Sequence, residues 1–491
     1  MTSGQYSLHG AIIRTRSPAG LYEDHFRSKY RHPARKASFF LAREGWSATR
    51  AKYGSKRLER LVERDLRVIV SCAPFADGTI VGVTRDLGGE PRFDLACLLY
   101  APERLAPDDI RFDDAAMTAA ESYLPVSSCP LGGVLADALR QSNSGLRPLS
   151  DAALQQALRD GPLRPNEGPR PKSRPASPSS EQRVFFVGFG GYVREVVLPF
   201  FSDRVGGALD HRAELFRRHG TWPFPVTSDA SWLFDQVRQG EPLVIIASYH
   251  SDHVAQAREV LAANGRARVF IEKPAGVTPS DAAELERLRQ AGAWIDIGYN
   301  RRYAPFTVLS RALLRQRRGP VTVSVSVKEN SIPLSHWYFW PNQGTRVTGN
   351  MCHWIDLATH LVGSSSAAVE GAGTPDRCAL TLAFEDGSVA ALAASDDGDQ
   401  LRGVQEQIEL RRGDLTIRID DFLRCTVLTD GRRRVHRRLR RSKGHAEMYD
   451  QLKQRWLGGD SPAYPAADIA SVQHLVAAAV SCLDNVPVSG E

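Results

Sequence analysis

The sequence of 491 residues contains only seven cysteines, scattered and never spaced as C-x-x-C. An odd number without paired spacing argues against both a disulfide framework and a zinc site. We therefore expect reduced thiols that mostly fill the core, and no bound metal. The cysteines are Cys72, Cys97, Cys129, Cys352, Cys378, Cys425 and Cys482.

Long apolar runs are also lacking. No run approaches the roughly 18 residues that span a bilayer, and the polar start MTSGQYSLHG lacks the basic and apolar regions of a secretory signal. These absences predict a cytoplasmic protein without a membrane partner. No internal repeat occurs at the periods typical of solenoids, so that class is excluded as well.

Charge of neither sign dominates, because the net charge is only +7. Part of the excess lies in the basic run from Arg432 to Lys443. Such a run can attract phosphates or an acidic partner. The favoured alternative is a solvated strand edge whose arginines deter edge-to-edge pairing. Without interleaved aromatic residues, the run does not predict nucleic-acid binding.

The length indicates roughly three domains of about 150 residues each. Residues 161–181 are rich in proline and nearly free of large apolar side chains, which predicts a linker. Residues 1–160 carry no chemical motif and form an accessory α+β module, available to a protein partner. Its predicted elements are a helix within 25–64 and strands at 66–71, 79–84 and 93–100.

After the linker, short apolar strands alternate with amphipathic helical stretches. This alternation predicts βαβ units in a doubly wound parallel sheet, which is a Rossmann fold, over residues 182–303. From about Val321 the pattern becomes rich in strands with Asp-Gly and Arg-Gly-Asp steps, which favour hairpins. We therefore predict a second α/β domain over residues 304–491, with a large and mostly antiparallel sheet.

A glycine turn follows the first strand of the predicted Rossmann domain, Val184–Val187. Glycines there let backbone N–H groups and the dipole of the next helix meet a dinucleotide diphosphate. Val193 replaces the usual third small residue, so a purely structural turn stays an alternative. The predicted cofactor-binding residues of this turn are Gly188, Phe189, Gly190, Gly191 and Tyr192.

Acidic and polar residues end the next strands. Asp210 lies 22 residues after Gly188, where a carboxylate accepts hydrogen bonds from the adenosine ribose, and this favours NAD. His211 and Arg212 could instead reach the 2′-phosphate of NADP, and an ordinary charged loop is the third interpretation. The loop after Leu243–Ala247 supplies candidate contacts to the nicotinamide ribose. They are Ser248, Tyr249, His250 and His253, while Asp252 is equally suited to cap the following helix.

Three motifs resemble the Gfo/Idh/MocA family of oxidoreductases over about residues 182–490. They are FIEKP (270–274), GYNRRYAP (298–305) and GNMCHWIDLATHLVG (349–363). The resemblance implies that Glu272, Lys273 and Pro274 lie at the cofactor, with a cis or otherwise tight proline that aims Lys273 into the site. It also implies that Lys273 touches the reacting hydroxyl and that His353 acts as acid/base or polarises the oxygen. Hydride transfer needs two such groups.

The sequence departs from the family at Gly349, where many members carry an aspartate one helical turn before the histidine. Either Lys273 and His353 act without a carboxylate, or Asn350 substitutes as a hydrogen-bonding partner. Asp356 is expected to support the same helix.

An aromatic, amide-rich loop precedes this helix and suits a sugar, because aromatic faces stack on sugar C–H groups. Packing in an interdomain core is the alternative for its rings. Arg302 and Tyr303 follow the last predicted Rossmann strand. They either bind substrate oxygens or hold the domain junction. The other predicted substrate-binding residues are Trp340, Asn342, Gln343, Thr345 and His353.

Together these features predict an NAD(P)-dependent oxidoreductase for a sugar, nucleotide sugar or cyclitol in polysaccharide or natural-product biosynthesis. A cyclic imine reductase is the second candidate. A non-catalytic Rossmann partner or regulatory subunit is the third, favoured by Val193 and Gly349. The resemblance further implies a homodimer or homotetramer formed through the open face of the second sheet.

Overall fold

The structure is a computed structural model, and it describes most of residues 182–484 together with helix α2 (Pro33–Asp65). Side chains of α2 are described over 34–58, and the backbone of six strands is described between residues 6 and 148. The ranges left out after residue 182 are 211–212, 214–215, 218–219, 228–229, 333–342, 364–365, 375–376, 460–462 and 485–491.

The N-terminal part combines α2 with a sheet of order β4-β3-β2-β1-β5, in which β6 also pairs with β1. The strands are β1 (Tyr6–Ile13), β2 (Arg67–Phe75), β3 (Gly78–Asp86), β4 (Pro91–Arg92), β5 (Ile110–Phe112) and β6 (Arg147–Pro148). This α+β composition confirms the predicted class, and α2, β2 and β3 cover the predicted helix and two of the predicted strands. The third, at 93–100, lies outside the described residues.

The Rossmann sheet contains six parallel strands in the order β12-β11-β10-β7-β8-β9. They are β7 (Val184–Val187), β8 (Val205–Leu209), β9 (Val226–Thr227), β10 (Leu243–Ile246), β11 (Arg268–Ile271) and β12 (Trp294–Ile297). Strands such as VFFV and LVII are buried throughout, as expected for a parallel sheet covered on both faces. The chain order reverses between β7 and β10, which is where ligands bind in such sheets.

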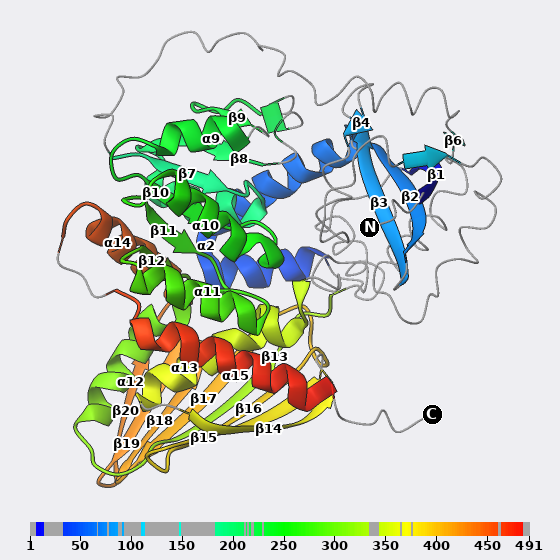
Figure 1. Ribbon diagram of the computed structural model, residues 1–491. Coiled ribbons are helices and arrows are strands. Elements are labelled where there is room, and N and C mark those ends of the chain that lie inside the picture. Colours follow the sequence, from blue (N-terminus) through cyan, green and yellow to red (C-terminus); the bar gives the residue numbers. More distant parts are fainter. Residues whose placement is uncertain are drawn as a thin grey trace.

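Helices and tight turns connect these strands and lie on both sides of the sheet (Figure 1). They are η3 (Val193–Val197), α7 (Leu198–Phe201), α9 (Ala230–Val237), η4 (His250–Asp252), α10 (His253–Ala263), α11 (Pro279–Gln290) and η5 (Asn300–Tyr303). The predicted Rossmann fold is thereby confirmed.

The second sheet contains eight strands in the order β14-β15-β16-β13-β17-β18-β19-β20, all antiparallel except the β13–β16 pair. They are β13 (Thr322–Lys328), β14 (Ser366–Thr374), β15 (Arg377–Phe384), β16 (Val389–Ser395), β17 (Gln405–Arg412), β18 (Leu415–Asp420), β19 (Arg424–Thr429) and β20 (Arg432–Arg437). Burial alternates along β13, β15 and β16, so one face is packed and the other open. This is the predicted second sheet.

Helices cover only the packed face of this sheet (Figure 1). They are α12 (Pro305–Arg315), η8 (Val347–Met351), α13 (Cys352–Val362) and α15 (Ala466–Asp484). Within the described residues, the window Ala466–Leu483 of α15 is long and apolar enough to cross a membrane. However, Val472 and Val476 lie in the hydrophobic core, and α15 packs against β14 and α13, as a core helix does.

Helix α14 (His445–Trp456) belongs to the second half of the chain but packs on the Rossmann sheet. Its residues Met448, Tyr449 and Leu452 share a buried cluster with Phe186 and Phe270. The hydrophobic core therefore does not follow the boundary that we predict between 303 and 304.

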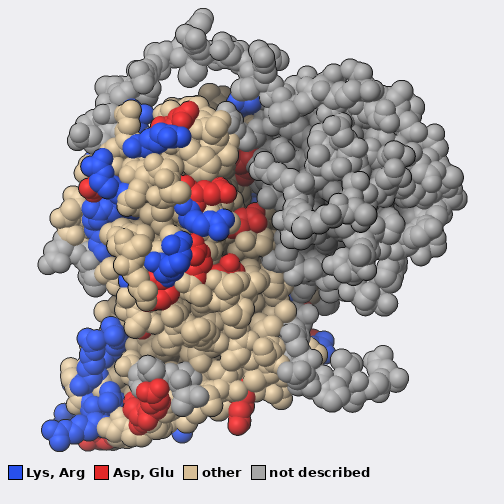
Figure 2. Space-filling view, viewed as in Figure 1, with Lys and Arg blue, Asp and Glu red and all other residues tan. Residues whose placement is uncertain are grey.

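Strand β20 forms one edge of the second sheet, and all its residues are exposed. Lys and Arg side chains gather over the end of the sheet where β20 and α12 lie, at the lower left of Figure 2. The favoured interpretation of the basic run, a solvated strand edge, matches this strand. The end of the run differs, because Arg441 and Lys443 are buried in ion pairs with carboxylates.

Candidate functional site

The glycine turn after β7 is tight on one side and open on the other. Gly188 has a φ of +88°, and a Cβ there would lie 2.6 Å from the carbonyl oxygen of Ala247. Only glycine fits that position. A Cβ on Gly190 would meet no atom within 4 Å, so open space remains beside its backbone. The turn therefore fits a dinucleotide diphosphate, which needs close approach to backbone N–H groups.

Asp210 follows β8 and is buried, with 5% of its surface exposed. Its Oδ2 accepts a hydrogen bond of 2.8 Å from the backbone N of Phe189. This bond fixes the carboxylate beside the glycine turn, where an acceptor for ribose hydroxyls would be required. His211, the alternative contact to a 2′-phosphate, lies outside the described residues.

The loop after β10 approaches the Lys273 loop and the second sheet. His253 Nδ1 lies 2.9 Å from the carbonyl oxygen of Pro274, and His250 Nδ1 lies 3.3 Å from that of Gln343. Carbonyl oxygens only accept, so both Nδ1 atoms donate. Burial lowers the pKa of His253 to about 4, which keeps its ring neutral.

Two other residues of this loop are linked by a hydrogen bond. Asp252 occupies the N-cap position of α10, but its side chain does not cap the helix. Its Oδ1 instead accepts from Ser251 Oγ at 2.8 Å. The Ser248 hydroxyl lies 2.6 Å from Gln256 Oε1. The loop is therefore held by its own side chains at the carboxyl end of β10.

Lys273 follows β11 and crosses to the second part of the chain. Its Nζ donates to the carbonyl oxygen of Gly349 at 2.7 Å, and the peptide bond to Pro274 is cis, as the resemblance implies. Gly349 belongs to the π-helical turn η8, which leads directly into α13 and His353. Asn350 lies half-buried on the same turn. The structure thus brings the proposed lysine, histidine and asparagine to one junction.

His353 presents an unsatisfied polar atom at this junction. Its Nδ1 is buried and has no hydrogen-bond partner within the described part of the chain. Burial, followed by the positive charges of Arg301 and Lys273, lowers the pKa of His353 well below its usual value. The imidazole is therefore neutral near pH 7 and able to accept or donate one hydrogen bond.

Tyr299 is a site candidate that the sequence analysis does not name. Its ring lies 6.3 Å from that of His353, and its hydroxyl is also buried without a partner among the residues described. Buried polar atoms are normally paired, so orphaned ones indicate a missing ligand or water. Tyr299 follows β12, and its place after a strand is the signal that could have identified it.

Glu272 faces away from Lys273, toward α14. The hydroxyl of Tyr449 donates a short hydrogen bond to Glu272 Oε1, and it lies 2.9 Å from the hydroxyl of Tyr192 in the glycine turn. Burial raises the pKa of Glu272 to about 7. The contact that the structure gives Glu272 is therefore with the protein itself, and it ties the glycine turn to the Lys273 loop.

The guanidinium of Arg302 bonds other protein groups. This supports a role at the domain junction over a role in substrate binding. Its side chain is 3% exposed, and its guanidinium bonds Asp356 at 2.6 Å and Asp468 at 2.5 Å. Tyr464 completes this network by donating to Asp356 at 2.6 Å. Burial raises the pKa of the neighbouring Tyr303, and the charge of Asp296 adds to the shift.

A second buried charge cluster lies next to His353. Arg301 donates to Glu406 at 2.7 and 3.0 Å, Trp354 Nε1 donates to the same carboxylate at 2.8 Å, and Lys443 completes the set. These cations hold the pKa of Glu406 far below its usual range, against the opposing effect of burial. Because its carboxylate partner fixes Arg301, the positive charge that acts on His353 is fixed as well.

Glu329 is another residue that sequence reasoning missed. It directly follows β13, is 4% exposed, and faces Arg301, Lys443 and Arg346. Burial raises its pKa despite these cations. The site side of the second sheet therefore contains a carboxyl group, although Gly349 provides none. A glutamate one position beyond an alternating strand gives no distinctive signal in the sequence.

The remaining predicted substrate residues divide into two groups. Gln343 Nε2 donates to Ser251 Oγ at 2.8 Å, and Thr345 Oγ1 accepts from the backbone N of Val347 at 3.2 Å. The first contact links η4 to the segment before η8, and the second lies at the start of η8. Trp340 and Asn342 lie outside the described residues. In the described ranges, no group of three or more His, Cys, Asp or Glu residues could hold a metal ion.

Comparison with solved structures relates this arrangement to dehydrogenases. The structure of GenD2 from gentamicin A biosynthesis in complex with NAD has a TM-score of 0.51 at 21% identity, covering 63% of this chain and 97% of that one. UDP-N-acetylglucosamine 3-dehydrogenase GnnA from Acidithiobacillus ferrooxidans has a TM-score of 0.50 at 19% identity, covering 61% and 98%. A dehydrogenase from Chromobacterium violaceum has a TM-score of 0.52 at 18% identity, covering 62% and 95%. At these identities the likeness shows the fold.

Comparison of the sequence itself finds no relative. No family model and no curated protein matches the chain.

Proposed function

We propose that this protein is an NAD(P)-dependent oxidoreductase that transfers a hydride between the nicotinamide and a sugar-like alcohol or ketone. The observation that carries the proposal is the meeting of Lys273 and His353 at the carboxyl edge of a Rossmann sheet, joined through Gly349. The shared fold with an NAD-bound dehydrogenase supports the cofactor.

The residues would divide the work as follows. Gly190 and Gly191 would receive the diphosphate, and Asp210 would accept hydrogen bonds from the adenosine ribose. Ser248, Tyr249 and the Lys273 loop would border the nicotinamide. The nicotinamide supplies the hydride acceptor or donor when it is bound.

The proton of the substrate hydroxyl needs its own acceptor. The Lys273 ammonium, held by Gly349, would stabilise the developing charge on oxygen, and the neutral imidazole of His353 would exchange the proton. Asn350 lies on the turn before His353 and would fix the substrate or the ring. Tyr299, with its orphaned hydroxyl, would accept or donate one further hydrogen bond.

A polyol suits the site better than an apolar substrate, because two buried polar atoms there have no protein partner among the described residues. They are Tyr299 Oη and His353 Nδ1. The fold shared with a UDP-N-acetylglucosamine 3-dehydrogenase supports a sugar or nucleotide sugar, and that shared with GenD2 supports natural-product biosynthesis.

The first experiment is a fluorescence titration of the purified protein with NADH and NADPH. We expect saturable binding, with NADH preferred because the Asp210 carboxylate repels a 2′-phosphate. Turnover is then measured across a panel of free sugars, nucleotide sugars and cyclitols. Failure of both nucleotides to bind would refute the proposal, and binding without turnover of any substrate would favour a regulatory role.

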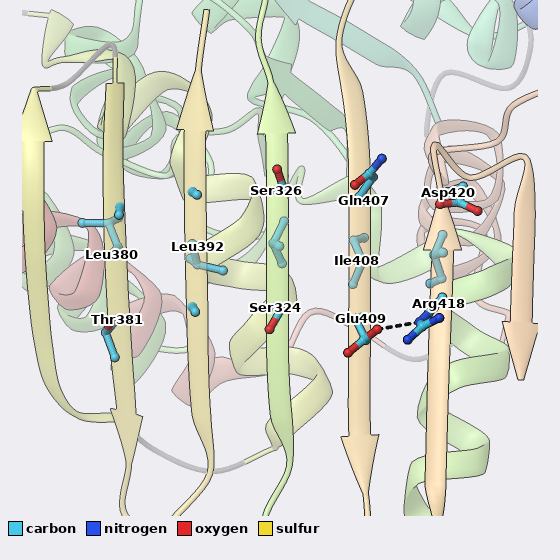
Figure 3. A pocket seen from close by; sticks show the side chains of 15 residues that line it. Ser324, Ser326, Leu380, Thr381, Leu392, Gln407, Ile408, Glu409, Arg418 and Asp420 are labelled. Carbon is cyan, nitrogen blue, oxygen red and sulfur yellow. Dashed lines mark hydrogen bonds and ion pairs between the residues drawn. The ribbon is translucent and has the colours of Figure 1, made fainter. Parts of the chain in front are cut away.

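We also propose that two copies associate through the open face of the second sheet. Figure 3 shows this face, with Ser324 and Ser326 on β13 and Thr381 on β15, the next strand but one. Its exposed centre consists mainly of small residues, so a second sheet can approach closely. Light scattering at micromolar concentration should give at least twice the monomer mass, and a monodisperse monomer would contradict this.

A further inference from the structure

Helix α2 precedes the Rossmann domain by more than a hundred residues in the sequence. In the structure it nevertheless lies against both the Rossmann domain and the domain of the second sheet (Figure 1). It is broken at Gly45, whose φ of 86° and ψ of 175° belong to a region that essentially only glycine adopts. The kink is also crowded, since a Cβ on Gly45 would lie 2.8 Å from the guanidinium of Arg440. Gly45 therefore sets the angle between the two halves of α2.

The first half of α2 is anchored to loops of the second sheet. Arg43 bonds Asp421 at 2.7 Å and donates to the carbonyl oxygen of Arg402 at 2.9 Å. Glu44 accepts from Arg441, and the backbone N of Arg441 donates to the carbonyl oxygen of Arg43 at 2.9 Å. These side chains are largely buried, so the ion pairs are screened less than surface pairs would be.

The second half of α2 rests on the glycine turn. Ser55 is 8% exposed, and its Oγ accepts from Arg194 at 3.1 Å. The same oxygen lies 3.4 Å from the position that a Cβ of Gly191 would occupy. Ser55 thus touches one side of the turn, while the space beside Gly190 stays open.

Two lysines of α2 add charge to this contact. Lys52 and Lys56 lie close enough to Glu195 that their charges lower its pKa, although burial raises it overall. Glu195 belongs to η3, the turn that starts the helix after the glycines. Lys52 and Lys56 therefore add positive charge next to η3, which follows the turn where a dinucleotide diphosphate would bind.

We propose that α2 is a strap across the dinucleotide crevice, closed by Ser55 at the glycine turn, which slows cofactor release. The strap is pinned at one end to the second sheet and at the other to the Rossmann domain. This proposal rests on the proposed function, because it requires NADH or NADPH as the bound ligand.

The test compares two glycine substitutions in the full-length protein. Gly45→Ala cannot keep the positive φ without strain, so it should open the strap. Gly54→Ala is the matched control, because a Cβ there meets no atom within 4 Å. Stopped-flow fluorescence would follow release of NADH, or of NADPH if that nucleotide binds more tightly. We expect at least tenfold faster release from Gly45→Ala and an unchanged rate from Gly54→Ala.

A second variant guards against misfolding of Gly45→Ala. The hydrogen bond between the backbones of Arg441 and Arg43 brings these positions within reach of a disulfide, and both side chains converge on Asp421. The pair Arg43→Cys and Arg441→Cys should release NADH at least tenfold more slowly when oxidised than when reduced. Oxidised and reduced wild-type protein control for the native thiols.

The outcomes separate the strap from the proposed function. If wild-type protein binds neither nucleotide, the proposed function fails. If it binds one, but folded Gly45→Ala and Gly54→Ala release it at the same rate, the strap is overturned and the function stands. Equal release from the oxidised and reduced cysteine pair, once the disulfide is verified by mass, overturns the strap in the same way.

Discussion

Lys273 and Gly349 join the two sheets at the site, because the Nζ of the lysine donates to the carbonyl oxygen of the glycine at 2.7 Å. Many members of the family that the sequence resembles carry an aspartate at the position of Gly349, one helical turn before the histidine. Here the backbone carbonyl of Gly349 accepts a hydrogen bond from the Lys273 ammonium. A carbonyl oxygen carries no formal charge, so this hydrogen bond holds Lys273 in place without forming an ion pair.

Replacement of Lys273 by methionine should abolish turnover while the cofactor still binds. Methionine keeps most of the side-chain volume but removes the charge and the bond to Gly349. Because the ammonium would stabilise oxygen charge only in the transition state, we expect kcat to fall roughly 10²–10³-fold with little change in the Kd for NADH. Steady-state kinetic assays measure kcat, and fluorescence titration measures the Kd for NADH.

Lys453→Met is the control for this experiment, since Lys453 bonds Asp203 and the carbonyl oxygen of Phe200 on the outside of the Rossmann domain. It should retain wild-type turnover. A Lys273→Met protein as active as this control would remove Lys273 from the proposed machinery.

Asp210→Asn should shift the preference between the two nucleotides. Asparagine can still accept from the backbone N of Phe189, so the turn is expected to keep its shape. A hydrogen bond to a charged group contributes about 1.5–3 kcal/mol, and loss of the charge should raise the Kd for NADH roughly tenfold. The Kd for NADPH should stay level or fall, because repulsion of its 2′-phosphate disappears. Fluorescence titrations with NADH and with NADPH measure the two Kd values. A tenfold loss of affinity for both nucleotides would indicate a damaged turn.

Much of the Rossmann site could be predicted because its signals are local. Each parallel strand is a short apolar run, and the residues after it lie at the carboxyl edge of the sheet, as Asp210 and Lys273 do. The glycine turn is also a local signal, because the positive φ at Gly188 requires glycine at that one position. The parallel class of the first sheet and the mostly antiparallel class of the second followed from the same strand patterns.

The rest depends on contacts between distant segments. Nothing near Glu272 indicates that Tyr449 would bond it, and nothing near Arg302 indicates its partners Asp356 and Asp468. The sequence alone therefore could not decide whether Arg302 binds the substrate or holds the domain junction. The docking of α2 was equally hidden, because a helix that binds through one arginine, one glutamate and one serine has no distinctive pattern.

Glu272→Gln should change how stability depends on pH. The folded pKa of Glu272 is raised to about 7 from an ordinary value of 4.5, so folding favours the protonated form. Its stabilising effect is fully present below about pH 4.5 and is lost as pH rises through 7. Relative to the variant, the wild-type free energy of unfolding should therefore fall by about 3 kcal/mol between these limits.

Urea denaturation of both proteins at pH 5 and pH 8 measures this difference. Glu259→Gln, on the exposed face of α10, should show no such change relative to wild type. Parallel stability curves for wild type and Glu272→Gln would mean that Glu272 is ionised in the folded protein across this range.

Arg302 distinguishes a junction residue from a substrate-binding one. Arg302→Met would leave the fully buried carboxylate of Asp356 without its cation, and breaking a buried pair in this way typically costs about 3–5 kcal/mol. Arg302→Lys should rescue only part of this loss, since one ammonium cannot reproduce the planar set of bonds to Asp356, Asp468 and Tyr464. Arg315→Met, an exposed arginine on α12, serves as the control and should change stability by less than about 0.5 kcal/mol. Urea denaturation and steady-state kinetics are measured on the same preparations. If Arg302 holds the junction, the free energy of unfolding falls strongly while KM of the folded protein stays nearly unchanged. A raised KM at wild-type stability would instead show that Arg302 binds the substrate.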